Sequence, residues 1–311
     1  MILCIGTTPA VQRVMLFREF HLDAVNRAVT TLDGACGKAV NTAKVLKVLG
    51  EKPLATGFIG GDRGEYLRTV LESKGIETDF VTVPPRTRQC ITLIDETAGT
   101  QTELVEESQA VEPAAYERLL AVIRKHIPNC RGMVMLGTIT PGGPADFYFQ
   151  CARIAQEAGV ISLVDAHGPL LLESLKAKPG LVKPNRKELA ATLGRALNNE
   201  SEVLGAMREL AQRGAQRVVV TAGTAATLAF DGQNFWRLIP PRINIVNPIG
   251  SGDAFAAGLM AKLARGADLG EACRWGTAAA AANALTLMPG EINWEIIKKL
   301  LELIPLDVIL M

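Results

Sequence analysis

Short apolar runs alternate with longer segments of helical spacing along most of the chain, and this alternation limits the possible folds more than any other feature. The apolar runs that predict strands are residues 2–5, 54–59, 133–136, 161–164 and 217–221. The segments with helical spacing are residues 39–49, 66–73, 145–158, 253–264 and 272–287. Strands separated by helices predict an α/β fold with a mostly parallel sheet, in which ligands bind beyond the carboxyl ends of the strands.

Two half-polar, extended segments interrupt the alternation, at about residues 11–32 and 86–108. The second contains "QCITLIDETAGTQTELV", which predicts a β-hairpin with its turn at Ala98-Gly99. The sequence contains no long linker and no internal repeat. We therefore expect a single domain over residues 1–311, in which both segments contribute strands to a small β lid.

Composition excludes several classes of protein. A net charge of +1 gives no basic surplus for nucleic acid or for an anionic membrane. The six cysteines are scattered without a C-x-x-C pair, which argues against a zinc site or a disulfide framework and favours thiols in a reducing cytoplasm. No charged leader and no uninterrupted apolar run long enough for a membrane span is present. We expect a cytoplasmic protein whose partner is a small molecule.

The segment "NPIGSGDAFAAG", residues 247–258, carries the most specific chemistry. Gly250, Ser251 and Gly252 precede a predicted helix, and free N–H groups at a helix start bind anions. Asp253 falls in the first turn, where a carboxylate could accept a proton from a hydroxyl. An anion site beside a base suits phosphoryl transfer to an alcohol. The alternative is an ordinary loop followed by a helix that begins with an acidic residue.

Other nucleotide and hydrolase motifs are absent from the sequence. There is no G-x-x-x-x-G-K-[ST] loop, no G-x-G-x-x-G after the first strand and no G-x-S-x-G elbow. The histidines His21, His126 and His167 have no triad-like context, so surface or structural roles are the simpler interpretation.

Five segments in order resemble the ribokinase-like (PfkB) carbohydrate kinases. They are "GACGKAVNTAKVLKVLG", "GFIGGDRGEYL", "LVKPNRKEL", "VVVTAGTAATLAF" and "NPIGSGDAFAAGL", and together they span nearly the whole chain. Within the family the chain is most similar to the 1-phosphofructokinase and tagatose-6-phosphate kinase branch. The resemblance implies a three-layer αβα sandwich with a β lid, and an ATP- and Mg²⁺-dependent kinase that acts on a phosphorylated ketohexose. It also implies a homodimer formed through the lid.

On the donor side, the resemblance implies that Asp253 is the base and that the N–H groups of Gly250, Ser251 and Gly252 form the anion hole. Five further positions match motif residues of the family. Asn185 and Glu188 would help to hold Mg²⁺ through water, Thr221 and Gly223 would contact ATP, and Asn283 would lie near the adenine. A helix-capping role for Asn185 and Glu188 and a packing role for Asn283 stay open as alternatives.

On the acceptor side, the resemblance implies that Asn41 contacts sugar hydroxyls. Lys38 and Arg88, joined by Arg27 from the lid, would bind the phosphate of the acceptor, and Glu106 would be the acidic residue of the lid. Ordinary solvated charge is the alternative for Lys38 and Arg88.

The chain departs from the family pattern after the first strand. Thr8 and Gln12 in "TTPAVQ" stand where the branch usually has Asn and Asp. Because Gln12 is uncharged and can donate as well as accept, the identity of the sugar stays open. A kinase of an unphosphorylated sugar or nucleoside, or a non-catalytic sugar-binding protein on the same fold, remain the alternatives.

Overall fold

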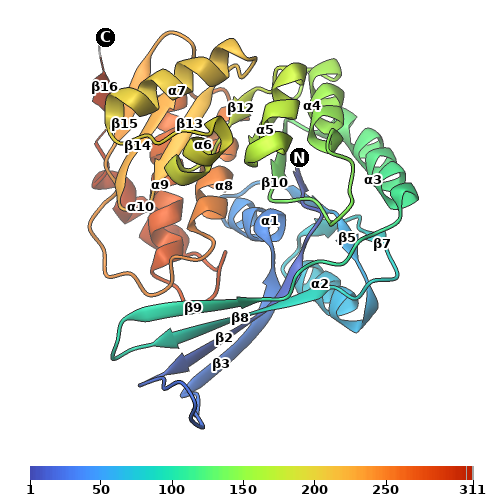
Figure 1. Cartoon of the computed structure of the whole chain (residues 1–311), viewed down its shortest axis with the longest axis vertical. Coiled ribbons are helices and arrows are strands. Elements are labelled where there is room, and N and C mark those ends of the chain that lie inside the picture. Colours follow the sequence, from blue (N-terminus) through green and yellow to red (C-terminus); the bar gives the residue numbers. More distant parts are fainter. Residues whose placement is uncertain (306, 310–311) are drawn as a thin grey trace.

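The centre of the molecule is a ten-stranded sheet with the order β16-β15-β14-β13-β12-β11-β10-β1-β4-β6 (Figure 1). The computed structural model describes residues 1–305 and 307–309. In the order of the sheet, neighbouring strands from β6 to β13 are parallel. Beyond β13, the strands β14, β15 and β16 pair antiparallel and form one edge of the sheet. This arrangement confirms the predicted α/β class with its mostly parallel sheet.

The strands of this sheet are β1 (Ile2–Ile5), β4 (Pro53–Thr56), β6 (Glu77–Thr78), β10 (Gly132–Leu136), β11 (Ile161–Asp165), β12 (Leu181–Val182), β13 (Val218–Ala222), β14 (Ala225–Phe230), β15 (Phe235–Leu238) and β16 (Asp307–Ile309). The helices are α1 (Lys38–Val48), α2 (Gly61–Ser73), α3 (Pro113–His126), α4 (Phe147–Glu157), α5 (Gly168–Ser174), α6 (Arg186–Leu193), α7 (Glu200–Gln212), α8 (Ser251–Leu263), α9 (Leu269–Ala284) and α10 (Trp294–Glu302).

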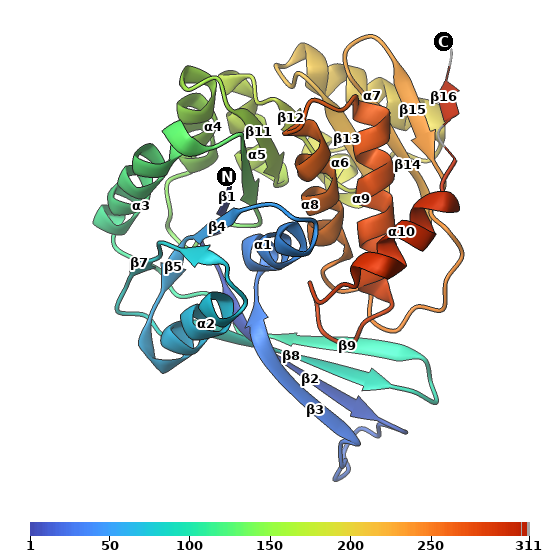
Figure 2. The ribbon, with the colours of Figure 1, turned by 180° about the vertical axis from the view of Figure 1, so that it is seen from behind.

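Helices cover both faces of the sheet, so the body has three layers. Strand residues alternate between two hydrophobic cores: Ile2 and Cys4 pack with α1, α2, α8, α9 and α10, whereas Leu3 and Ile5 pack with α3, α4, α5 and α7. Figure 2 shows the molecule from behind, with helices α1, α2, α8, α9 and α10 in view. Buried strands with apolar residues on both faces are what a sheet covered on both sides requires.

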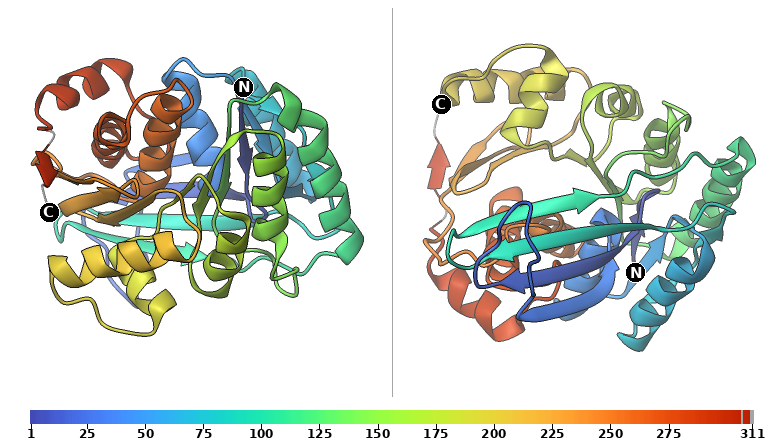
Figure 3. Two further views of the ribbon diagram at one scale, coloured as in Figure 1. Left: turned by 90° about the horizontal axis from the view of Figure 1, so that it is seen from above. Right: turned by 60° about the horizontal axis from the view of Figure 1, so that its bottom comes forward.

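The lid is a separate four-stranded sheet that projects from the body, at the bottom of Figure 1 and nearest the viewer in the right panel of Figure 3. Its order is β3-β2-β8-β9, with bounds β2 (Ala10–Phe17), β3 (Thr30–Cys36), β8 (Arg88–Asp95) and β9 (Thr100–Val105). The antiparallel pair β8 and β9 is the hairpin that the sequence predicts, with its turn in residues 96–99.

One predicted strand is interrupted. The apolar run 54–59 divides at Gly57 into β4 and the short strand β5 (Phe58–Ile59), which pairs with β7 (Val81–Thr82). Gly57 has a φ of +154°, and a Cβ at this position would collide with the carbonyl oxygen of Gly6. A close backbone approach of this kind requires glycine.

The backbones of helices α8 and α9 approach each other closely at Gly258. A Cβ there would lie 2.5 Å from the carbonyl oxygen of Trp275 on α9. This contact fixes α8 closely against α9, and Asp253 lies in the first turn of α8. Among the described residues, no helix combines the length and apolar character needed to cross a bilayer.

Candidate active site

Two pockets meet at the carboxyl edge of the sheet. The first, which we call the lid pocket, has a volume of about 420 Å³ and lies between the lid strands, the start of α1 and the start of α8. The second, the helix pocket, measures about 350 Å³ and lies between β13, residues 240–248 and the helices α8 and α9. Asn185, Thr221 and Gly252 line both pockets. The two pockets therefore adjoin one another at the N-terminus of α8.

The turn before α8 presents free N–H groups to the lid pocket. Gly250 has a φ of +83°, a conformation that favours glycine, and a Cβ there would lie 2.8 Å from the side chain of Pro289. Among the described residues, no acceptor contacts the N–H groups of Gly250, Gly252 and Asp253. The N–H of Ser251 donates to the carbonyl of Pro248 at 3.1 Å, so the predicted role of Ser251 in an anion hole does not fit this arrangement.

Asp253 lies in the first turn of α8 and is buried. Its Oδ2 accepts a hydrogen bond of 2.8 Å from Nδ2 of Asn41, and its carbonyl accepts one of 3.1 Å from the hydroxyl of Thr42. Burial raises the pKa of Asp253 to about 6, although Lys38 and Asn41 act in the opposite direction. The carboxyl group is thus a weak acid that can bind and release a proton near neutral pH.

A buried carboxylate between two lysines forms the floor of the lid pocket. Asp165, at the end of β11, lies 3.3 Å from Nζ of Lys38 and 2.8 Å from Nζ of Lys183. Burial opposes ionisation of Asp165, but Lys183 and Lys38 hold its pKa below the usual range. Sequence reasoning missed Asp165 and Lys183. Each directly follows an apolar strand run, in "SLVDAHG" and "GLVKPN", and this position at a strand end was the available signal.

Two amide side chains in the lid pocket have an oxygen without a partner. Gln12 is fully buried and donates from Nε2 to the hydroxyl of Thr92 at 2.8 Å, while its Oε1 has no partner. Oδ1 of Asn41 is likewise buried and unpaired. Both residues line the pocket. Buried polar atoms are almost always hydrogen-bonded, so each of these two oxygens lacks the donor that such an atom normally has.

Arg88 lines the lid pocket, as the sequence predicts. Its guanidinium donates only to the backbone carbonyls of Thr8, at 3.2 Å, and of Glu106, at 3.4 Å. No ion pair between Arg88 and a carboxylate occurs in residues 1–305, so this cation is available to an anion.

Glu106 does not line the pocket, and its carboxylate bonds Arg63 at 2.7 Å and the N–H of Gln89 at 2.8 Å, so its role at the acceptor site stays a prediction. Glu103 and Val105 do line the pocket. Alternate residues of a strand face the same side, so Glu103 is the acid that β9 presents there. Arg27 is exposed in the β2–β3 connection, away from the lining residues of both pockets, and its role stays a prediction.

Asn185 and Glu188 form a complete capping box at the start of α6, with bonds of 2.9 Å and 2.8 Å. Both residues also line the lid pocket, so the capping interpretation is confirmed and their role in holding Mg²⁺ stays a prediction. Within the described chain, no group of three or more His, Cys, Asp or Glu residues could hold a metal by itself. One carboxylate and one amide fit a Mg²⁺ ion that keeps its waters and is bound mainly by phosphates.

The helix pocket is mostly apolar and contains Thr221 and Gly223 as predicted. Ile243, Phe255 and Ala280 are among its lining residues, which suits a flat aromatic base. Asn283 is not among them. It is fully buried and bonds Ile249, Ser251 and Gly290, which agrees with the packing alternative, and its placement near the adenine stays a prediction.

Comparison with known proteins gives the class of this protein. The family model described as pfkB family carbohydrate kinase matches residues 1–294. The chain belongs to this family, whose members are carbohydrate kinases, and it is an ATP-dependent sugar kinase.

Several relatives locate the chain within the family. It is 31% identical over 296 residues to tagatose-6-phosphate kinase of Staphylococcus epidermidis, covering 94% of this chain and 95% of the relative. A structure of a possible 1-phosphofructokinase from Thermotoga maritima superposes with a TM-score of 0.91 at 26% identity, with 99% of each chain covered. Phosphofructokinase-2 from Escherichia coli gives a TM-score of 0.90 at 26% identity, with 97% of this chain and 98% of that chain covered.

The raised pKa of Asp253 predicts a specific pH dependence. If the ionised carboxylate is needed for turnover, kcat/KM rises with pH and reaches half its plateau at a pH of about 6, because kcat/KM reports the pKa of the free enzyme. Lys38, Asp165 and Lys183 are the other charged groups that act on it. The measurement is kcat/KM for the acceptor over a range of pH, with direct detection of ADP. A profile that stays flat down to about pH 4.5 would contradict the assignment, because an Asp with the ordinary pKa of about 3.9 is still mostly ionised at that pH.

Proposed function

We propose that this kinase transfers the γ-phosphoryl group of ATP to a hydroxyl of a ketohexose that already carries a phosphate. The observation that supports this acceptor class is Arg88, a cation that faces the lid pocket and has only backbone carbonyls as partners. Lys38 and Lys183 line the same pocket. A dianionic phosphate is bound best by several cations, and a planar guanidinium can hold it through two hydrogen bonds.

ATP would occupy the helix pocket with its base against the apolar side chains and its γ-phosphate near Gly252, where the two pockets join. The N–H groups of Gly250, Gly252 and Asp253 would bind the charge that develops on the transferred group. Asn185 and Glu188 would hold a hydrated Mg²⁺ ion, which neutralises phosphate charge when it is bound.

The acceptor hydroxyl would lie beside Asp253, which takes its proton as the bond to phosphorus forms. Other hydroxyls of the sugar would donate to the unpaired oxygens of Gln12 and Asn41. The lid strands would close the pocket on one side and limit access of water, so that transfer to the sugar is favoured over hydrolysis.

The relatives support the same acceptor class. One is named tagatose-6-phosphate kinase, and a structure of phosphofructokinase-2 is described as a complex with fructose-6-phosphate. Free ketohexoses form the alternative acceptor class, because Gln12 provides a neutral contact for a sugar hydroxyl.

The acceptor class can be tested with two neighbouring arginines. Arg88→Ala should raise KM about tenfold or more for the phosphorylated sugar that is turned over, since a charge-assisted hydrogen bond contributes about 1.5–3 kcal/mol. The panel is fructose 1-phosphate, fructose 6-phosphate, tagatose 6-phosphate, fructose and tagatose, followed by ADP release. Arg86→Ala is the matched control, because Arg86 is exposed and pairs with Asp62 outside the lid pocket.

Two results would contradict the acceptor class. One is preferential turnover of the free ketohexoses by the unchanged enzyme. The other is an equal effect of Arg88→Ala on phosphorylated and free acceptors.

We also propose that two copies associate through their lids, and that the enzyme is cytoplasmic. The lid exposes large apolar side chains on its strands and on the β2–β3 connection: Leu22 is 87% exposed and Val25 83%, and Val29, Leu32 and Leu104 are also exposed. Exposed apolar groups concentrated on one element are typical of an association surface.

The proposed cytoplasmic location is supported by the cysteines: all six are free, which suits a reducing compartment.

Sedimentation velocity tests the lid association. The wild-type protein should sediment as a dimer. The double variant Leu22→Asp with Val25→Asp should sediment as a monomer, because dimer formation would bury two carboxylates per copy without a partner. Leu303→Asp is the control: Leu303 is 62% exposed at the end of α10, on the body of the protein, and its replacement should leave the dimer intact. A monomeric unchanged protein, or a double variant that still dimerises, would contradict the proposal.

A further inference from the structure

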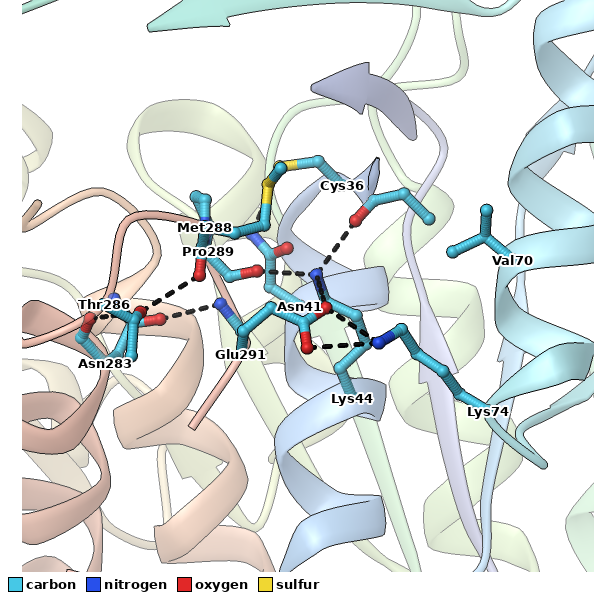
Figure 4. A network of polar contacts seen from close by, with 12 residues as sticks. Cys36, Asn41, Lys44, Val70, Lys74, Asn283, Thr286, Met288, Pro289 and Glu291 are labelled. Atoms are coloured by element: carbon cyan, nitrogen blue, oxygen red, sulfur yellow. Dashed lines mark hydrogen bonds and ion pairs between the residues drawn. The ribbon is translucent and has the colours of Figure 1, made fainter. Parts of the chain in front are cut away.

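Lys44 is a buried cation behind the active site. It lies on α1, is 3% exposed and lines neither pocket. Its Nζ donates to the carbonyl of Ala35 at 3.0 Å, to the carbonyl of Pro289 at 2.6 Å and to Oε1 of Glu291 at 3.4 Å (Figure 4). An ammonium has three donors, and all three are used here.

The acceptors of Lys44 belong to two segments that contribute to the active site from opposite ends of the chain. Ala35 lies in lid strand β3, directly before Cys36 and Gly37, which line the lid pocket. Pro289 and Glu291 lie in the segment after α9. One side chain therefore fixes the end of a lid strand relative to the 289–291 segment.

The 289–291 segment connects in turn to the turn before α8. The N–H of Gly290 donates to Oδ1 of Asn283 at 2.8 Å, and Nδ2 of Asn283 donates to the carbonyl of Ile249 at 2.8 Å and to Oγ of Ser251 at 3.2 Å. Figure 4 shows Lys44, Pro289, Glu291 and Asn283 as one continuous network. The contacts lead from Lys44 to the residues that hold the Gly250–Gly252 turn.

The packing around Gly290 in this network is tight. A Cβ at Gly290 would lie 2.7 Å from Cε of Lys44 and 3.1 Å from Cα of Asn41, the residue that bonds Asp253. Gly290 has a φ of +76°, which also favours glycine. The segment is thus held directly against the turn of α1 that carries Asn41.

We propose that Lys44 is a positioning residue for phosphoryl transfer, which couples the end of lid strand β3 to the anion-binding turn before α8 through residues 289–291 and Asn283. This inference rests on the proposed function of that turn. Lys44 acts through other residues and contacts neither substrate pocket. Its loss should misplace N–H groups that act mainly in the transition state, so that kcat falls while KM for both substrates changes little.

The test compares three variants by steady-state kinetics, at a temperature where circular dichroism shows each to be folded. Lys44→Met should lower kcat at least tenfold, with both KM values within about threefold of the unchanged enzyme. Glu291→Ala should lower kcat several-fold, because Lys44 then loses its carboxylate partner. Lys74→Met should leave kcat within about twofold of the wild-type value. Lys74 pairs with Glu291 at 3.1 Å from the solvent side, but it does not bond the carbonyl of Ala35 or of Pro289.

Several outcomes would overturn the coupling. They are a folded Lys44→Met enzyme with kcat close to the unchanged value, a Lys44→Met effect confined to KM, and a Lys74→Met variant as impaired as Glu291→Ala. If Lys44→Met does not fold, Glu291→Ala decides alone, since Glu291 is half-exposed and its removal leaves the core intact. Unchanged kcat in that variant would also reject the proposal. A failure of the proposed function would look different, because the unchanged enzyme would then not phosphorylate any sugar phosphate.

Discussion

The site depends on one buried hydrogen bond, from Nδ2 of Asn41 to Oδ2 of Asp253 at 2.8 Å. The bond joins the first turn of α1 to the first turn of α8, and Asn41 and Asp253 lie 212 positions apart in the chain. It orients the carboxylate and leaves the buried Oδ1 of Asn41 without a hydrogen-bond partner. Burial raises the pKa of Asp253 to about 6, whereas the bond from Asn41 acts in the opposite direction, so the contact that orients the carboxylate also favours its ionised form.

The two pockets divide the chemistry by polarity. The lid pocket contains the cations Lys38, Arg88 and Lys183 together with Asp253, whereas the helix pocket is lined mainly by apolar groups. They meet at Gly252, a residue without a side chain that lines both pockets and whose N–H group has no acceptor among the described residues. A phosphoryl group that passes from one ligand to the other would cross at this point. The lid contributes Gln12, Arg88 and Glu103 to the first pocket, so closure and acceptor recognition use the same strands.

Much of the fold and part of the site could be predicted from the sequence. The alternation of strand and helix patterns indicates a parallel sheet, and it also indicates that ligands bind at the carboxyl edge, where Lys38, Asn41 and Asp253 are found. There are physical reasons why the other site residues could not be predicted. Asp165 lies outside the five family segments, and although Lys183 lies inside "LVKPNRKEL", the pairing of the two depends on the adjacency of β11 and β12. The choice between Glu103 and Glu106 depends on which face of β9 meets the pocket, and the sequence pattern of a lid strand does not define that face.

The direction of single backbone groups could not be predicted either. The N–H of Ser251 bonds Pro248, and the side chain of Asn283 bonds Ile249 and Gly290, because the turn before α8 closes on itself and on the 289–291 segment. The contact of Asn283 with Ile249 is tertiary and that of Ser251 is a local turn, and none of them leaves a periodic signal in the sequence. They nevertheless decide which N–H groups remain free for an anion.

The central claim is that Asp253 is the base of a phosphoryl transfer carried out between the two pockets. The most direct test is the turnover of Asp253→Asn, which keeps the size of the side chain and removes the proton acceptor. The account predicts a loss of ~10³-fold or more in kcat from general-base and positioning effects together, with KM for ATP nearly unchanged because the helix pocket is intact. A variant that turns over at a rate close to that of the unchanged enzyme would contradict it.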